Sequence, residues 1–318
     1  MAVTMEWESR LGRRLRVRDL YILSTVVKSG GMAKAARQLA MSQPAVSEAI
    51  ANLEHMLGVR LLDRSPRGIE PTIYAEAMLK RSTIVFDELK QSVTDVESLA
   101  DPTTGELTIG CPEPIAATAL PHIMQRFAEK YPRVVLRVDD VPSPAIKSSG
   151  LRERKFDLVM VRPRVPPPKD HVVDDLNVEY LFDDPLVVTA GMHTKWARRR
   201  KIDLAELADE PWILAPPQTW TYECVAEAFQ ARGLAMPKVN FVTLSVHLVA
   251  YFLTHGNFIS AYSTAWVRLN RLKALPVDMP IRPWPVAIAT LKHRTLSPVA
   301  ERFIECAREV AKSLVNSK

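Results

Sequence analysis

Residues 35–64 read AARQLAMSQPAVSEAIANLEHMLGVRLLDR, and this stretch decides how the first part of the chain folds. Apolar residues recur within it at steps of four and three: Val46, Ile50 and Leu53. That spacing is typical of one face of an α-helix. Ser42 stands just before this stripe, and serine is a favoured N-cap residue. Pro44 fits a first helical turn because its missing N–H would have no partner there. The stretch therefore predicts a helix that begins after Ser42.

Two further apolar stripes precede this helix. They consist of Leu20, Leu23 and Val27, followed by Met32, Ala35, Ala36 and Leu39. Breaks near residues 30–31 and 40–41 separate the stripes, so we expect three short helices over residues 18–60. Residues 60–72, RLLDRSPRGIEPT, place a Ser-Pro-Arg-Gly turn between two short apolar pieces. This pattern predicts a small two-stranded hairpin, or wing, after the third helix.

Residues 72–99 contain neither glycine nor proline and predict one long helix. Its apolar residues form a narrow stripe at steps of 7, 4, 7 and 3: Met78, Val85, Leu89, Val96 and Leu99. The rest of that surface is polar, so the helix has nothing of its own to pack on. We expect a homodimer through residues 72–99. The alternative is that a neighbouring domain covers the stripe.

After a linker at residues 101–105 the pattern changes to alternating strands and helices. Strands are expected at residues 107–109, 134–138, 158–161, 186–188, 212–214, 239–242, 258–259 and 286–289. Helices are expected at residues 114–130, 144–154, 222–232, 246–254 and 298–315. Such alternation indicates α/β units on a largely parallel sheet, enough for two lobes, and the last helix can return to the first lobe. The expected domains are residues 1–72, 73–100 and 101–318.

The composition limits the class of protein. The 318-residue chain is 47% apolar and 25% charged, which excludes a largely disordered protein. No apolar run approaches the ~20 residues that span a bilayer, and no apolar core follows the basic N-terminus as in a secretory signal. We therefore expect no membrane contact and a cytoplasmic location.

The three cysteines are scattered, which fits neither a disulfide framework nor a zinc module. The net charge is +6, and residues 1–72 hold 11 basic and 7 acidic residues, a balance that permits a polyanionic partner.

The pattern AAxxLxxSQPAVSxxIxxLExxLGxxLxxR of residues 35–64 resembles the winged helix-turn-helix of LysR-type transcriptional regulators. Later stretches are similar to family landmarks, namely EKYPRVVLRV, KFDLVMV, LADEPWIL and LSPVAERFIECAREV. The resemblance implies an α/β protein with an N-terminal all-α winged helix-turn-helix, a long linker helix and a two-lobed effector domain akin to periplasmic solute-binding proteins. Two positions depart from the family pattern. Gly30-Gly31 weakens the cap of the second helix, and Leu62 stands where an aromatic residue is usual.

The resemblance also implies partners. A dimer would bind an inverted repeat in double-stranded operator DNA, a homotetramer is the expected larger assembly, and RNA polymerase is a further candidate partner. A small-molecule effector between the lobes would favour one cleft geometry, and with it one spacing of the DNA-binding pairs.

Candidate DNA-binding residues lie at the start of the third helix and around the wing: Ser42, Gln43, Pro44, Ser47, Arg64 and Arg67. A recognition helix enters the major groove with its N-terminal residues leading, and glutamine can pair with adenine. Serine hydroxyls suit phosphate oxygens, and the wing arginines suit phosphates or a minor groove. The alternative is an ordinary three-helix interaction domain with a solvated polar face. Five arginines within residues 10–18 either touch the DNA backbone or form a solvated tail.

Four strand-to-helix junctions match the positions at which the family binds its effectors. They give these candidate effector residues: Pro112, Glu113, Ser143, Gln218, Thr219, Ser245 and His247. Helix N-termini offer free N–H groups to a ligand, but hydroxyl residues there can serve as helix caps alone, and a lone histidine is often structural. Glu113 would oppose an anion, so either it points away or the effector is neutral or cationic. Trp220, Tyr222 and Tyr262 either line the cleft or pack in the core.

The sequence contains no GxSxG, Walker or GxGxxG motif, so we expect neither an enzyme nor a bound cofactor. Cys111 precedes a possible helix, where a thiol can become reactive, but a buried inert thiol is the preferred interpretation. Residues 162–168, RPRVPPP, predict a stiff exposed loop. The rival functions are a metabolic enzyme, an exported solute-binding protein and a regulator without effector response. Only the last of these fits the motifs.

Overall fold

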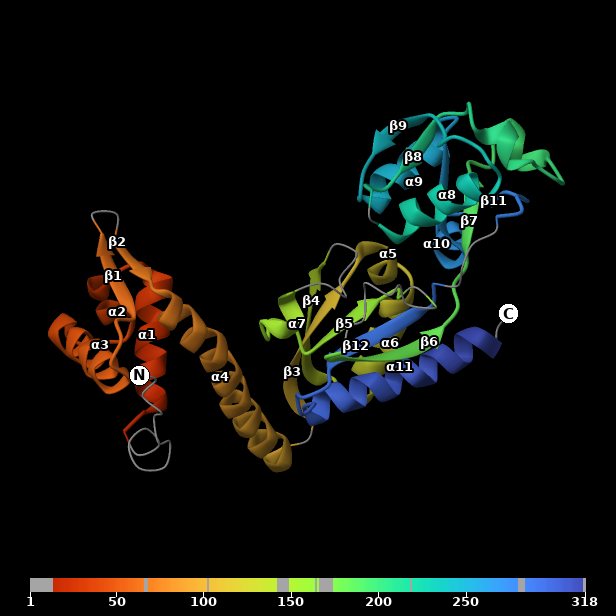
Figure 1. The fold of residues 1–318 in the computed structure, drawn as a ribbon. Coiled ribbons are helices and arrows are strands. Elements are labelled where there is room, and N and C mark those ends of the chain that lie inside the picture. Colours follow the sequence, from red (N-terminus) through yellow and green to blue (C-terminus); the bar gives the residue numbers. More distant parts are fainter. Residues whose placement is uncertain are drawn as a thin grey trace. The chain divides into compact units, whose positions relative to one another are not determined.

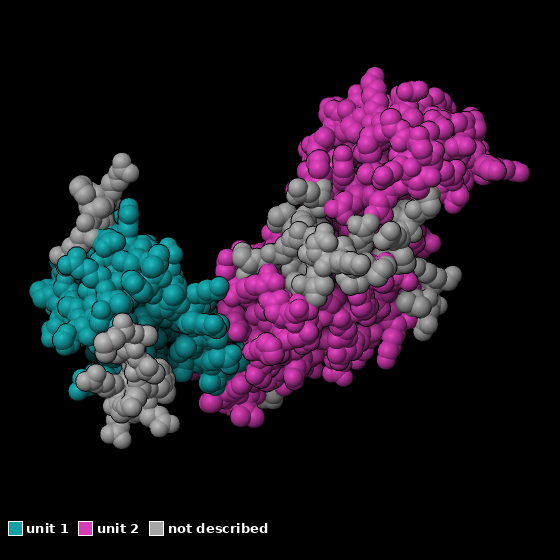
Figure 2. All heavy atoms as spheres, in the orientation of Figure 1, with its two compact units in different colours: residues 1–92 teal, residues 93–318 magenta. Residues whose placement is uncertain are grey.

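The computed structural model describes residues 14–65, 68–101, 103–141, 149–163, 165, 174–217, 219–279 and 284–316. The chain forms two compact units, Met1–Ser92 and Val93–Lys318, which Figure 2 shows in two colours. Each unit has a hydrophobic core of its own.

The first unit consists of three short helices, a hairpin and the first part of a long helix (Figure 1). In chain order these elements are α1 (Val17–Ser29), α2 (Met32–Gln38), α3 (Gln43–Leu57), β1 (Leu62–Ser65), β2 (Gly68–Pro71) and α4 (Ile73–Ala100). The predicted apolar stripes meet in one core around Leu23, Val26, Ala35, Val46 and Leu53. The structure thus confirms the three predicted helices, the wing and the long helix.

The ends of these short helices follow from local chemistry. The Ser42 hydroxyl accepts a hydrogen bond from the Ala45 N–H at 3.3 Å, and α3 therefore begins at Gln43. Gly58 follows α3 with φ 70°, a left-handed conformation that glycine adopts without steric cost. Gly31 precedes α2 and provides no side-chain cap, as the Gly30-Gly31 pair predicts.

The second unit contains two five-stranded sheets, and each sheet with its helices forms a lobe. The first sheet has the order β4-β3-β5-β12-β6 and consists of β3 (Thr104–Cys111), β4 (Arg133–Asp140), β5 (Leu158–Val161), β6 (Leu176–Phe182) and β12 (Val286–Leu291). The second has the order β11-β7-β10-β8-β9 and consists of β7 (Leu186–Ala190), β8 (Trp212–Leu214), β9 (Val239–Val242), β10 (Ile259–Ser263) and β11 (Lys273–Ala274).

Both sheets are mixed, so the prediction of a largely parallel sheet is wrong. β3 pairs parallel with β4 and β5, but β12 pairs antiparallel with β5 and β6. In the second sheet β8 pairs parallel with β9 and β10, while β7 runs antiparallel to β10 and β11. The chain crosses between the lobes after β6 and again before β12. Because β12 starts at the end of the sheet where β6 finishes, it must run the opposite way.

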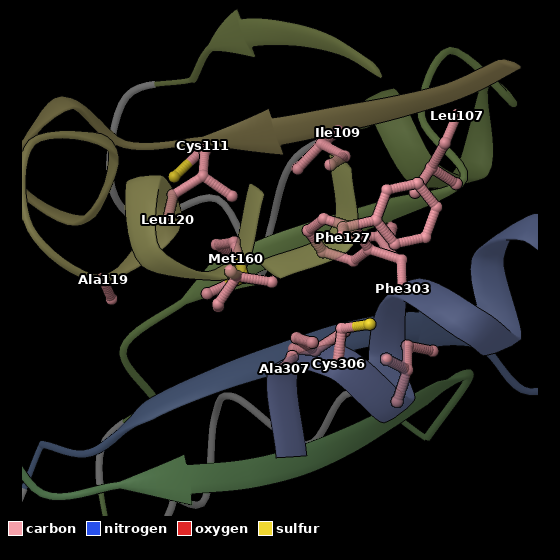
Figure 3. Packing of buried hydrophobic residues seen from close by; sticks show 14 of the residues in the cluster. Leu107, Ile109, Cys111, Ala119, Leu120, Phe127, Met160, Phe303, Cys306 and Ala307 are labelled. Atoms are coloured by element: carbon pink, nitrogen blue, oxygen red, sulfur yellow. The ribbon is translucent and has the colours of Figure 1, made fainter. Parts of the chain in front are cut away.

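The helices of the second unit cover both sheets. Those of the first lobe are α5 (Glu113–Ala116), α6 (Ala119–Lys130), α7 (Ser149–Arg152) and α11 (Pro298–Asn316). Those of the second lobe are α8 (Trp220–Ala231), α9 (Val246–His255), α10 (Thr264–Leu269) and two 3-10 turns, Lys195–Arg198 and Leu204–Leu207. Helix α11 packs against α6 and the first sheet, so the last helix does return to the first lobe. Phe127 of α6 and Phe303 of α11 meet in that core with 5.5 Å between ring centroids (Figure 3).

Several elements differ from the sequence prediction. The helix expected over residues 114–130 is two helices, because the backbone leaves the helical conformation at Thr118 (φ −121°, ψ −73°). The strands β6 and β11 and the helix α10 were not predicted. Of the helix expected over residues 144–154, residues 144–148 lie outside the described part of the chain.

Candidate functional site

The first turn of α3 is the first candidate site. Gln43 and Pro44 are exposed there, and Ser47 is half-buried one turn later. The buried Val46 and its neighbours on the same stripe fix the helix to the core from the other side. The Ser42 hydroxyl serves as the N-cap, so its role in the free protein is to start the helix. The side chains that lead α3 are therefore rigidly placed and open to a ligand.

Glu54 connects α3 with the hairpin. Its Oε1 accepts hydrogen bonds from the N–H groups of Leu61 at 2.7 Å and Leu62 at 3.2 Å. These two bonds fix the point at which the chain enters β1, and β1 then pairs antiparallel with β2. The backbone of Arg64 lies in β1, while Arg67 lies outside the described residues. The sequence pattern contains Glu54 but does not show that it positions the wing.

Glu113 is the centre of the second candidate site. It begins α5 in the first lobe and reaches the N-terminus of α9 in the second lobe. Its Oε2 accepts a hydrogen bond from the Val246 N–H at 3.3 Å, and its Oε1 lies 3.7 Å from His247 Nε2. The side chain of Glu113 is 34% exposed and that of His247 is 90% exposed. Glu113 therefore does not point away, because its carboxylate occupies the place where a helix start favours an anion.

Tyr262 of β10 adds a polar group near this carboxylate. The residue is only 4% exposed, and its ring stacks on Trp266 with 4.1 Å between centroids. Burial, and next the Glu113 carboxylate, raise the pKa of Tyr262, so its phenol stays neutral. Among the described residues the hydroxyl has no hydrogen-bond partner.

The remaining candidate effector residues have structural roles or lie elsewhere. Ser245 caps α9 and Thr219 caps α8, each by accepting a backbone N–H at 3.4 Å. Thr219 is also buried, and its hydroxyl donates to a backbone carbonyl. Pro112 is buried and precedes α5. Two candidates lie outside the described residues: Ser143 and Gln218. Of the candidates that the structure describes, Glu113, Ser245 and His247 are therefore brought together at one junction.

Arg162 is a buried charged residue between the lobes that the sequence did not predict. It was predicted to begin an exposed loop, and this is wrong because the residue is 6% exposed. Its guanidinium donates to Asp184 Oδ2 at 2.7 Å and to the Trp284 carbonyl at 3.2 Å, and it lies 4.5 Å over the Trp220 ring. Burial lowers the pKa of Arg162, and the Asp184 carboxylate opposes that effect.

This guanidinium joins both crossings between the lobes. Asp184 lies between β6 and β7, where the chain leaves the first lobe, and Trp284 lies just before β12, where it returns. A pocket of about 130 Å³ lies beside the first crossing and contains none of the expected effector residues. Its lining includes Thr118, His122, Asp184 and Arg268. An arginine followed by prolines gives no sign of burial in the sequence, so no local signal could have found Arg162.

The described residues offer little for catalysis or redox chemistry. Cys111 is 1% exposed, and burial, followed by the Asp140 carboxylate, raises its pKa, so the thiol stays protonated. This agrees with the preferred interpretation of an inert thiol. Within the described part of the chain no group of three His, Cys, Asp or Glu residues could hold a metal ion. No described helix is both long and apolar enough to cross a membrane.

Two family models match the chain. The model of the bacterial regulatory helix-turn-helix proteins of the lysR family matches residues 17–76, and the model of the LysR substrate binding domain matches residues 100–312. Similar curated proteins include the regulator YybE of Bacillus subtilis, 26% identical with 94% of this chain and 97% of that protein covered. Another is the regulator TdcA of Escherichia coli, 22% identical with 92% and 93% covered.

Solved structures share the fold. The LysR family regulator CbnR matches with a TM-score of 0.62 at 20% identity, covering 93% of this chain and 99% of that chain. A full-length OxyR from Pseudomonas aeruginosa matches with a TM-score of 0.66 at 19% identity, covering 94% and 95%. These findings confirm the predicted fold class, a helix-turn-helix followed by a two-lobed α/β domain. The chain belongs to the LysR family of DNA-binding transcriptional regulators, which carry an effector-binding domain and are not enzymes.

Proposed function

We propose that this regulator reads operator DNA with the first turn of α3 and with the hairpin. Gln43 contacts base edges, with Pro44 beside it in the same turn. Ser42 and Ser47 contact phosphates, and Arg64 and Arg67 contact the backbone or a minor groove. The observation that carries the proposal is the exposed first turn of α3 on a buried core. The hairpin held by Glu54 adds to it. CbnR, which shares the fold, has been solved with its target DNA.

The proposed domains are residues 1–72 for DNA binding, 73–100 for dimerisation and 101–318 for effector binding. Along α4 the exposed fractions of Leu89, Val93 and Val96 are 47%, 58% and 66%, which is high for apolar side chains. A second copy of α4 would cover this stripe and place two DNA-binding units on one inverted repeat. LysR-type regulators form oligomers. A homotetramer, a contact with RNA polymerase and a cytoplasmic location complete the proposal.

A gel shift tests the DNA-binding part. The probe is the DNA immediately upstream of the protein's own gene, at ~150 mM salt with competitor DNA, because phosphate contacts without sequence preference dominate at low salt. We expect specific binding by the wild type and its loss in the Gln43→Ala, Ser47→Ala double variant. Specific binding that the double variant retains would contradict the role of α3.

The proposed effector is neutral or cationic at the Glu113 junction. The Glu113 carboxylate already accepts the Val246 N–H at the start of α9 and carries the charge that a carboxylate effector would bring. An anion would have to displace it or bind beside it against Coulomb repulsion. An ammonium group would be attracted to Glu113, and a hydroxyl or amide could bond to the Tyr262 hydroxyl, which has no partner within the described part of the chain.

Thermal unfolding with matched small molecules tests this charge preference. The ligands are series of amines, amides and carboxylates on the same carbon skeletons, and the proteins are the wild type, Glu113→Gln and the control Glu129→Gln, an exposed carboxylate on α6. We expect amines or amides to stabilise the wild type and Glu129→Gln, and Glu113→Gln to lose the response to amines. A carboxylate that stabilises the wild type and Glu113→Gln equally would contradict the proposal.

A further inference from the structure

A hollow of about 380 Å³ lies between the start of α1 and one side of α3. On the α1 side it is lined by Arg14, Arg16, Arg18, Asp19 and Ile22, and on the other side by Met41, Ala45, Glu48, Ala49, Asn52 and Met56. Three arginines within five residues therefore line one hollow. The family's helix-turn-helix model matches only from residue 17, so Arg14 and Arg16 precede the matched region.

The arginines of this hollow place positive charge at an exposed surface. Arg14, Arg16 and Arg18 are all exposed, and among the described residues none of them has an ion-pair partner. Arg18 Nη2 lies 3.7 Å from the Met41 sulfur. Asp19 and Glu48 also line the hollow and reduce its net charge, but the arginines remain in excess. An unpaired cluster of arginines suits the phosphates of a nucleic acid backbone.

The position of the hollow on α3 shows which part of a duplex it would meet. At 100° per residue, Gln43 and Ser47 lie on one edge of the exposed face of α3, and Ala49 and Asn52 lie on the other edge. A helix in the major groove has a phosphate backbone on each side of it. When Gln43 and Ser47 turn toward the bases and one strand, the hollow faces the other strand.

We propose that Arg14, Arg16 and Arg18 form a phosphate-binding surface that clamps the backbone strand beside the recognition helix. This surface supplies affinity that does not depend on base sequence, and Gln43 at the start of α3 supplies the specificity. The inference rests on the proposed function, because it requires α3 to enter the major groove. For these three arginines it favours DNA contact over a solvated tail, while Arg10 and Arg13 lie outside the described residues.

The salt dependence of DNA binding tests this surface. The probes are a fluorescent mixed-sequence duplex and the duplex upstream of the protein's own gene, titrated by anisotropy from low to physiological salt. The full-length test variant is Arg14→Gln, Arg16→Gln, Arg18→Gln. The control Arg198→Gln, Arg200→Gln, Lys201→Gln removes the same charge from exposed residues of the second unit that have no ion pair among the described residues. Circular dichroism checks that both variants are folded.

Each phosphate contact contributes about 0.9 to the slope of log K against log salt. We expect the slope on both duplexes to fall by about 2 to 3 in the α1 variant and to stay unchanged in the control. The preference for the upstream duplex should remain. An unchanged slope in the α1 variant, or an equal fall in the control, would overturn this inference. The proposed function would still stand if the wild type prefers the upstream duplex and the Gln43→Ala, Ser47→Ala variant loses that preference. If the wild type shows no preference for any DNA, the proposed function fails as well.

Discussion

Replacing Arg162 by methionine removes a side chain that joins both crossings between the lobes. Methionine keeps an unbranched apolar stem but leaves the Asp184 carboxylate without its cation. That carboxylate is nearly inaccessible, since the two side chains of the pair are 1% and 6% exposed. The variant also loses the hydrogen bonds from Arg162 to the Asp184 and Trp284 carbonyls.

Breaking a buried ion pair from one side costs about 3–5 kcal/mol. In a unit of this size each kcal/mol lowers Tm by about 2–4 °C, so we expect a loss of roughly 10 °C for the unit Val93–Lys318. The double variant Arg162→Met, Asp184→Asn should recover part of this loss, because no unpaired charge remains buried. The asparagine can also still accept the Ala265 N–H that Asp184 Oδ1 accepts at 3.0 Å.

Thermal unfolding followed by circular dichroism measures these differences, with urea unfolding as a second measure. A matched control is Arg152→Met, which breaks an exposed ion pair with Asp175 and should cost at most about 1 kcal/mol. An Arg162→Met variant that unfolds at the wild-type temperature would show that the ion pair with Asp184 does not stabilise this unit. A double variant no more stable than the single one would show that the unpaired Asp184 charge is not the cause of the loss.

Three further predictions concern other parts of the chain. The double variant Leu89→Glu, Val96→Glu should convert dimers to monomers in sedimentation velocity, whereas the control Lys90→Glu, at an exposed residue of the same helix, should not. A double variant that stays dimeric would exclude this stripe as the interface. Glu54→Ala should lower the stability of the first unit by about 2 kcal/mol and weaken operator binding, because two backbone N–H groups lose their acceptor; unchanged urea unfolding would show that these bonds contribute little. Cys111 has a raised pKa, so iodoacetamide at neutral pH should label it only after unfolding, and rapid labelling of the native protein would contradict its burial.

The first unit could be predicted from sequence because its signals are local. The Ser42 cap and the Val46 stripe lie within a few residues of each other and leave few alternatives to a helix that starts there. Strands formed by short, mostly apolar runs of sequence were also predicted correctly. The predicted strands at Leu158–Val161, Trp212–Leu214 and Val239–Val242 coincide with β5, β8 and β9.

The features that were missed depend on contacts between residues far apart in the chain. Only Leu176 of strand β6 is buried, and Asn177 and Glu179 interrupt its apolar residues. The place of β6 is set by pairing with β12 more than a hundred residues later. The burial of Arg162 depends on Asp184 and Trp284, which only the folded chain brings together. Likewise, the sequence places Glu113 at a helix start but cannot show that its carboxylate bonds to a helix of the other lobe.

Selection of binding sites from a random duplex library shows whether a dimer of this protein reads DNA through α3. The wild-type protein should enrich an inverted repeat whose half-sites lie on one face of the duplex, about one helical turn or a multiple of it apart. The Gln43→Ala, Ser47→Ala variant, selected in parallel at the same salt, should enrich no such repeat. If the wild type enriches no sequence, or the variant enriches the same repeat, this protein does not read DNA as a dimer through α3.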